Sequence, residues 1–170
     1  ALRALGSNPG VLSRGYGRAD GAAENDEGAL LSERFPELPQ VQQPDRVAGA
    51  AALETLGADL IVLDDGFQHR RLARDLDLVL IDTTRPWGLP PAAPGAPPVE
   101  ALLPRGLLRE PLSSLKRADA VIFTRCDQAS EATLAEVERA VRRHAPLVPI
   151  AHAIHSPARV VTPTKAEEPS

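Results

Sequence analysis

The sequence has no methionine, a single cysteine and few aromatic residues. With only Cys126, the chain cannot form an intramolecular disulfide or a cysteine-based zinc cluster, and this usage fits a reducing compartment. No apolar run approaches the roughly 20 residues that a membrane-spanning helix requires, and the start carries no secretory signal. Because the chain does not begin with methionine and residues 1–6 resemble the last turn of a helix closed by glycine, we expect elements to precede residue 1.

Lysine is also scarce, and there is no excess of positive charge. Lys116 and Lys165 are the only lysines among 19 basic residues, which stand against 23 acidic residues and give a net charge of −4. We therefore expect no nucleic-acid partner. Neither lysine lies in a glycine-rich loop, and the pattern Gly-x-x-x-x-Gly-Lys-Ser/Thr is missing from these 170 residues.

Apolar runs alternate with helical patterns along the chain, which predicts an α/β fold with a mostly parallel sheet flanked by helices. Ile61–Leu63 and Leu76–Asp82 are continuous apolar runs, so we expect strands buried on both faces. Further strands are expected at 11–12, 41–43, 119–124 and 147–154, and helices at 29–35, 46–56, 113–117 and 131–144. We expect one partial domain over residues 1–156 and a linker-like tail over 157–170.

Two acidic residues, Asp64 and Asp65, directly follow the predicted strand at 60–63. Ligands bind at the carboxyl ends of strands in open parallel sheets. Two adjacent carboxylates repel each other unless a cation or a shared proton intervenes. Gly66 allows a tight turn, and Gln68 and His69 add polar groups nearby. A metal site is one interpretation, and a simple cap or turn is the other, since Asp and Gly are common turn residues.

Arginines gather in two loops. The segment Ser13-Arg14-Gly15-Tyr16-Gly17-Arg18 follows an apolar pair, and arginines with glycines suit a loop near phosphate. A second group, Arg70, Arg71 and Arg74, follows the acidic pair. These arginines either neutralise the carboxylates or contact an anionic substrate; the alternative is an ordinary solvated surface. The proline-rich stretch 86–98 predicts an extended loop, in which Trp87 is either an anchor or an exposed apolar contact.

Four stretches in order carry a family resemblance: residues 11–18, Leu63–His69 (Leu-Asp-Asp-Gly-Phe-Gln-His), Arg71–Asp75 and Leu102–Pro111 (Leu-Leu-Pro-Arg-Gly-Leu-Leu-Arg-Glu-Pro). In these stretches the sequence resembles the tetraacyldisaccharide 4′-kinases, the lipid A 4′-kinase family. The resemblance implies a partial P-loop NTPase-like (RecA-like) core that uses ATP and Mg²⁺. It also implies transfer of phosphate to the 4′-hydroxyl of the lipid A precursor tetraacyldisaccharide 1-phosphate, by a peripheral protein at the cytoplasmic face of the bacterial inner membrane.

The resemblance also implies roles for individual residues. Asp26 would belong to the dyad that activates the sugar hydroxyl, although Asn25 and Gly28 stand where the family has Gly and Pro. The other implied roles are catalytic for Asp65 and His69, nucleotide or phosphate binding for Ser13, Arg14 and Arg109, and metal binding for Asp64, Asp65, Gln68 and Glu110. A P-loop before residue 1 and a second domain after residue 170 are implied as well, so we expect the 170 residues alone to lack useful kinase activity.

Two other functions fit the same residues. A non-catalytic relative would bind nucleotide or acidic lipid through the arginine loops. Another P-loop ATPase or GTPase would use Thr124-Arg125-Cys126-Asp127, which stands where many GTPases carry the base-reading element Asn/Thr-Lys-x-Asp. Arg125 in place of lysine disfavours the GTPase.

Overall fold

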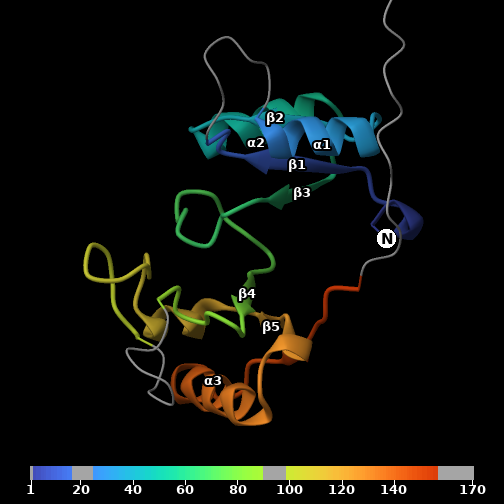
Figure 1. The fold of residues 1–170 in the computed structure, drawn as a ribbon. Helices are drawn as coiled ribbons and strands as arrows, with labels where there is room; N and C mark the ends of the chain where they lie inside the picture. Colours follow the sequence, from blue (N-terminus) through green and yellow to red (C-terminus); the bar gives the residue numbers. More distant parts are fainter. Residues whose placement is uncertain (1, 17–24, 90–98, 157–170) are drawn as a thin grey trace, which may run out of the picture. The chain divides into compact units, whose positions relative to one another are not determined.

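The computed structural model describes residues 2–16, 25–89 and 99–156, in which helices and parallel strands alternate (Figure 1). The α/β fold class predicted from the sequence is confirmed. The chain divides into two compact units, Ala1–Asp75 and Leu76–Ser170, each described by itself below. The boundaries predicted for a single partial domain and a tail stay predictions. The predicted tail, the end of the arginine segment at residues 17–18 and most of the proline-rich stretch lie outside the described residues.

The first unit contains a parallel sheet in the order β2-β1-β3, formed by β2 (Gln40–Gln42), β1 (Pro9–Ser13) and β3 (Leu60–Leu63). Leu12 of β1 is in register with Val41 on one side and with Leu63 on the other. The helices are α1 (Asp26–Arg34) and α2 (Arg46–Thr55), and the short 3₁₀ helix η1 (Leu2–Leu5) precedes β1. Parallel pairing brings the carboxyl ends of all three strands to one edge.

Close packing between α2 and β1 forms the core of the first unit. Leu12 and Leu53 are fully buried there, with Ala50 and Ala58 beside them. Gly49 lets α2 approach β1, because a Cβ atom at this position would stand 2.5 Å from a methyl carbon of Leu12. The packing therefore depends on a small residue on the inner face of α2.

The second unit contains another parallel sheet, in the order β4-β5-β6. Its strands are β4 (Leu78–Asp82), β5 (Ala120–Thr124) and β6 (Ile150–His152), and its helices are η2 (Leu112–Arg117), η3 (Cys126–Gln128) and α3 (Glu131–His144). The bounds predicted for α3 are confirmed, and Ser130 caps it by accepting a hydrogen bond from the Thr133 amide.

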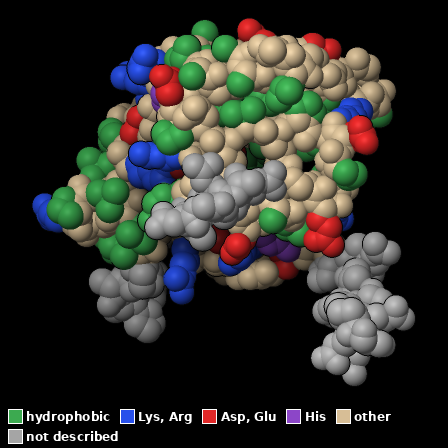
Figure 2. Space-filling model, turned by 90° about the horizontal axis from the view of Figure 1, so that it is seen from above, with side chains coloured by type: hydrophobic (Ala, Val, Ile, Leu, Met, Phe, Trp, Pro, Cys, Tyr) green, Lys and Arg blue, Asp and Glu red, His purple; other side chains and the backbone are tan. Residues whose placement is uncertain are grey.

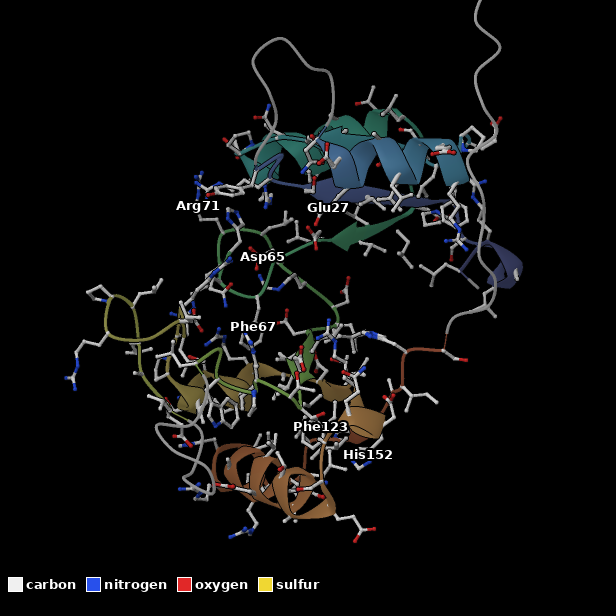
Figure 3. The ribbon with its side chains drawn as sticks, in the orientation of Figure 1. Glu27, Asp65, Phe67, Arg71, Phe123 and His152 are labelled. Carbon is white, nitrogen blue, oxygen red and sulfur yellow. The ribbon has the colours of Figure 1, made fainter. Side chains whose placement is uncertain are left out.

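The core of the second unit joins β5 to α3. Phe123, Val137 and Val141 are buried there together with Trp87, so the tryptophan anchors its loop, as one of the two interpretations predicted. The rings of Phe123 and His152 stack with their centroids 5.4 Å apart (Figure 3).

The prediction that two strands are buried on both faces was wrong. Val62 of β3 is 44% exposed, and Leu78 and Leu80 of β4 are also exposed. Within the described residues, β3 pairs only with β1, and β4 pairs only with β5, so each is an edge strand of its sheet. An apolar run identifies a strand, but its position in the sheet decides how much of it is covered.

The described surface mixes charges of both signs. Figure 2 shows basic and acidic side chains interspersed with hydrophobic ones on the face that it presents. No helix in the described part of the chain is both long enough and apolar enough to cross a membrane.

Candidate functional site

Two segments that hold predicted site residues follow neighbouring strands of the first unit. Ser13 ends β1 and Arg14 comes next, while Asp64 and Asp65 follow β3. The amide of Asp64 donates a hydrogen bond to the carbonyl oxygen of Leu12 at 2.9 Å, so the β1–β3 pairing extends to the acidic pair. The structure therefore brings an arginine segment and an acidic segment to one edge of a parallel sheet, where ligands bind in such folds.

The backbone at the acidic pair is unusual. Asp65 has a φ of 50°, a left-handed conformation that few residues other than glycine adopt. A Cβ atom at the next residue, Gly66, would stand 2.5 Å from the Leu63 side chain. Gly66 also accepts a hydrogen bond from the amide of His69 at 2.9 Å, which closes the turn. The sequence thus forms a tight turn directly after Asp65, and Figure 3 shows this residue in the loop that follows β3.

A buried arginine that the sequence analysis did not single out lies near enough to both segments to interact with their charges. Arg46, the first residue of α2, is 5% exposed and donates through Nη1 to the carbonyl oxygen of Gln43 at 2.8 Å. Its Nε is buried without a hydrogen-bond partner among the described residues. Burial and the neighbouring charge of Arg14 lower the pKa of Arg46, while the charges of Asp64 and Asp65 raise it.

The location of Arg46 in the sequence offered a signal for its role. A positive charge at the first position of a helix opposes the helix dipole, so arginine is electrostatically disfavoured there. The preceding residue, Asp45, caps α2 by accepting hydrogen bonds from the backbone amides of Val47 and Ala48. The helix can therefore begin here without any contribution from the Arg46 side chain. The charges of Asp64 and Asp65, which come from a distant part of the sequence, favour the charged form of Arg46 and offset part of this cost.

The start of α1 is tied to the same edge of the sheet. Asn25 caps α1, and its Oδ1 accepts from the Gly28 amide at 3.0 Å and from Nε2 of Gln42 at 2.6 Å. Oε1 of Gln42 in turn accepts a hydrogen bond from the backbone N–H of Asn25 at 3.2 Å. Asp26 is the first residue of the helix and is exposed, which also suits the helix dipole. Because Gln42 ends β2, Asp26 follows a residue held at the edge where β1 and β3 end.

The loop after the acidic pair holds the remaining site residues predicted for the first unit. Gln68 is exposed, whereas His69 is partly buried, and its Nε2 is buried without a hydrogen-bond partner among the described residues. Arg74 donates to the carbonyl oxygens of His69 and Leu72, so this arginine stabilises the loop backbone. Arg70 and Arg71 are exposed, which is compatible both with contact to an anionic substrate and with an ordinary solvated surface.

The other two predicted residues belong to the second unit. Glu110 accepts a hydrogen bond from Nη2 of Arg117 at 2.6 Å, in an ion pair that is mostly shielded from solvent. Arg109 is exposed. A metal role for Glu110 would have to compete with this pairing to Arg117.

The chain is similar to known kinases over almost its whole length. A family model described as tetraacyldisaccharide-1-P 4′-kinase matches residues 1–168. The chain belongs to this kinase family. Among curated relatives, a tetraacyldisaccharide 4′-kinase of Anaeromyxobacter sp. (strain Fw109-5) is 44% identical over 97% of this chain and 46% of its own length. One of Syntrophus aciditrophicus (strain SB) is 44% identical over 72% of this chain and 35% of its own length.

A third tetraacyldisaccharide 4′-kinase, from Geobacter sulfurreducens, is 42% identical over 74% of this chain and 37% of its own length. The chain thus spans less than half the length of these relatives. No solved structure matches the chain. The resemblance inferred from the four motifs is therefore confirmed at the level of the family.

The donor set of this tetraacyldisaccharide-1-P 4′-kinase family member fits a magnesium ion. Among the described residues, no group of three or more His, Cys, Asp or Glu side chains could hold a metal ion by itself. Magnesium does not need such a cage, since one or two carboxylates with waters and substrate phosphates are its usual ligands. Asp64 and Asp65 are two carboxylates of the kind that such a site requires. The roles predicted for individual residues remain predictions.

Proposed function

We propose that the protein transfers a phosphoryl group from ATP to the 4′-hydroxyl of tetraacyldisaccharide 1-phosphate, a step of lipid A biosynthesis. The juxtaposition of Asp64 and Asp65 with Arg14 and buried Arg46 at one sheet edge carries this proposal, together with the family membership. Phosphoryl transfer depends on positioning and on neutralising charge on the phosphate oxygens, and these groups are of the type required.

Each residue contributes a binding or positioning function. Asp64 and Asp65 would hold Mg²⁺, which neutralises the phosphates of the nucleotide when bound. Arg14 is exposed and offers a planar guanidinium to a phosphate group. Arg46 is held by its bond to Gln43, so its charge is fixed in direction before any ligand arrives. Asp26, exposed at the start of α1, is the candidate for accepting the proton of the sugar hydroxyl.

We also propose that the protein acts as a peripheral protein at the cytoplasmic face of the bacterial inner membrane. This location follows from the chemistry of the substrate, whose acyl chains stay in a bilayer while ATP is in the cytoplasm. Vesicle flotation with lipid A precursor in the bilayer tests it, and recovery of the protein only in the soluble fraction would contradict it.

The decisive experiment measures ATP-dependent phosphorylation of tetraacyldisaccharide 1-phosphate by the protein from the complete gene. Asp64→Asn and Asp65→Asn should each lower kcat/KM at least about 100-fold, because each removes a carboxylate from the metal ligands. Asparagine tolerates the left-handed backbone at position 65, so folding should be preserved. Glu54→Gln, an exposed change on α2, is the matched control and should retain full activity.

Two outcomes would count against the kinase. A protein that binds the lipid and ATP but shows no turnover would be the non-catalytic binding relative. A protein that hydrolyses ATP or GTP without transferring phosphate to the lipid would be another P-loop NTPase.

A further inference from the structure

A short loop of the second unit, residues 101–109, exposes three leucines within six residues and is called the leucine loop below. Leu102, Leu103 and Leu107 are 45%, 58% and 55% exposed. Figure 1 shows this loop in yellow, standing out from the sheet and from α3 of its unit. Single apolar side chains are common on protein surfaces, but a cluster on one protruding segment indicates contact with a partner.

The backbone of the leucine loop is closed by its own hydrogen bonds. The Leu103 amide donates to the carbonyl oxygen of Leu108 at 3.0 Å, and the Leu108 amide donates to that of Ala101 at 3.1 Å. The Gly106 amide donates to the carbonyl oxygen of Leu102 at 2.9 Å. A Cβ atom at Gly106 would stand 2.2 Å from the Ala101 carbonyl oxygen, so the chain returns too close to itself for a side chain there. The shape of the loop is therefore fixed before any partner arrives.

Two contacts seat the leucine loop on its unit. Leu108 is partly buried and packs against the core that contains Trp87 and Phe123. A Cβ atom at Gly88 would stand 2.7 Å from the Cβ atom of Leu107, so this glycine makes room for the loop to lie against it. Leu108 therefore supplies the apolar anchor, which leaves the exposed leucine side chains available for a contact outside the unit.

The charged side chains of the leucine loop are all positive. Arg105 and Arg109 are exposed, and residues 101–109 contain no acidic side chain. Of the neighbouring carboxylates, Glu110 is engaged by Arg117 in an ion pair that is mostly shielded from solvent. Glu100, directly before the loop, is exposed, and the two arginines outnumber it. Leucines beside an excess of positive charge suit an apolar layer bordered by negative charge.

We propose that the leucine loop inserts into the surface of a bilayer that contains anionic lipids. Its exposed leucines lie among the acyl chains, and Arg105 and Arg109 reach the headgroup phosphates while their methylene groups stay in the apolar layer. Backbone amides paired within the loop reduce the cost of entering that layer. The inference deepens the proposed function by naming the segment that contacts the membrane, and it rests on that function only in taking a bilayer as the place of work.

The test measures partition of the protein from the complete gene onto vesicles of phosphatidylcholine and phosphatidylglycerol that contain no lipid A precursor. A double variant, Leu103→Ser with Leu107→Ser, should lower the partition coefficient at least about tenfold, because two leucines are lost from the acyl layer. Leu147→Ser changes a leucine that is 93% exposed after α3, and this matched control should bind like the wild type. An unchanged partition coefficient in the double variant, or an equal loss in the control, would overturn the proposal.

The arginine contribution is tested by comparing anionic vesicles with vesicles of phosphatidylcholine alone. Arg105→Gln should weaken binding to the anionic vesicles about fivefold and leave binding to the neutral vesicles unchanged. High salt should remove the difference between this variant and the wild type, because salt screens exposed charges. Arg143→Gln, an exposed change near the end of α3, is the matched control and should bind normally. The same loss on both kinds of vesicle would contradict a contact between Arg105 and anionic headgroups.

Fluorescence measures insertion without relying on a loss of binding. In Leu103→Trp, emission of the new indole should move to shorter wavelength on anionic vesicles and should be quenched by brominated acyl chains. Trp87 is 3% exposed in the core, so the wild type supplies the background. Unquenched emission from bound protein would overturn the proposal. Conversion of a dimer to a monomer by the double variant, with vesicle binding unchanged, would also overturn it and would assign the loop to contact with a second copy.

The bilayer contact and the kinase fail in distinguishable ways. With lipid A precursor in detergent micelles, the double variant should keep its kcat, whereas its KM for the precursor in vesicles should rise. If the protein phosphorylates the precursor but the double variant binds vesicles normally, the loop proposal is wrong and the kinase stands. If the loop binds vesicles as described but no phosphorylation is found in micelles or vesicles, the kinase is wrong and the bilayer contact stands.

Discussion

Gln42 at the end of β2 and Asn25 at the start of α1 are joined by two hydrogen bonds. Nε2 of Gln42 donates to Oδ1 of Asn25 at 2.6 Å, and the backbone N–H of Asn25 donates to Oε1 of Gln42 at 3.2 Å. Asn25 simultaneously caps α1 through the Gly28 amide. One pair of amide side chains therefore both starts the helix and holds it to the sheet. Asp26 is the next residue, so its position depends on this pair.

We predict that Gln42→Ala lowers the free energy of unfolding by about 1–2 kcal/mol, since it leaves the Asn25 backbone amide without its acceptor and removes one of the two donors to Oδ1 of Asn25. If Asp26 accepts the hydroxyl proton, kcat should fall more than the KM for ATP changes. Urea denaturation and steady-state kinetics check the two effects. Gln40→Ala is the matched control, because Gln40 lies on the same strand and its side chain donates to the Ser32 hydroxyl at 3.0 Å instead of to Asn25. An equal loss of kcat in both variants would contradict the role of the Gln42–Asn25 pair.

We predict that Gly49→Ala destabilises the protein although alanine is the better helix former. Alanine in place of glycine usually stabilises a helix by about 1 kcal/mol. Here the added methyl group would stand 2.5 Å from Leu12, which is fully buried, and overpacking of this kind costs roughly 1–3 kcal/mol. Thermal unfolding measures the net loss. The neighbouring Ala48→Gly should cost about 1 kcal/mol by propensity alone, since Ala48 is exposed. A stabilised Gly49→Ala variant would show that the core relaxes around the new methyl group.

We predict that Arg46→Met separates stability from activity. Burial disfavours the charge of Arg46, and its Nε has no hydrogen-bond partner within the described residues, so an apolar side chain of similar length should raise stability by about 1 kcal/mol. Activity should fall at least about tenfold, because a fixed charge facing the acidic pair is lost. Denaturation and kcat/KM measure the two changes, with Arg34→Met, an exposed change at the end of α1, as the control. Full activity in Arg46→Met would remove Arg46 from the site.

We predict that Asp82 makes stability depend on pH in the acid range. Partial burial opposes its ionisation, but hydrogen bonds from the Thr84 hydroxyl and amide, together with Arg125, lower the pKa of Asp82 below its ordinary value of 3.8. A group whose pKa is lower in the folded state contributes stability that is fully present above its unfolded pKa. That contribution is lost as the pH falls below 3.8 and through the lower folded pKa.

Denaturation of the wild type and of Asp82→Asn between pH 2 and pH 6 checks this prediction. The difference in stability between the two should shrink as the pH falls. Asp127→Asn, an exposed change in η3, is the matched control variant. A difference in the free energy of unfolding that stays constant with pH would mean that ionisation of Asp82 does not contribute to stability.

Local sequence patterns were sufficient to identify the elements but not all of their bounds, since the helix predicted at 29–35 begins at Asp26 and the strand predicted at 147–154 covers only Ile150–His152. The bounds of α3 follow from its Ser130 cap and its apolar spacing, because both act over a few neighbouring residues. The acidic pair was placed at a strand end for a similar reason, since a continuous apolar run stops at Asp64. The burial of β3 and β4 could not be predicted in this way. It depends on which strand lies next to each, and composition within the run does not encode that.

The sequence by itself determined the family, the alternation of helices and strands, and the turn at Asp64, Asp65 and Gly66, because each is written in consecutive or regularly spaced residues. Only the tertiary structure decided that Arg46 is buried within reach of the charges of Arg14 and the acidic pair, and that Gln42 holds the start of α1. These relationships join segments far apart in the chain, and parallel strand pairing brings them to one edge. Burial and electrostatic coupling between such segments depend on distance in space, which residue order does not specify.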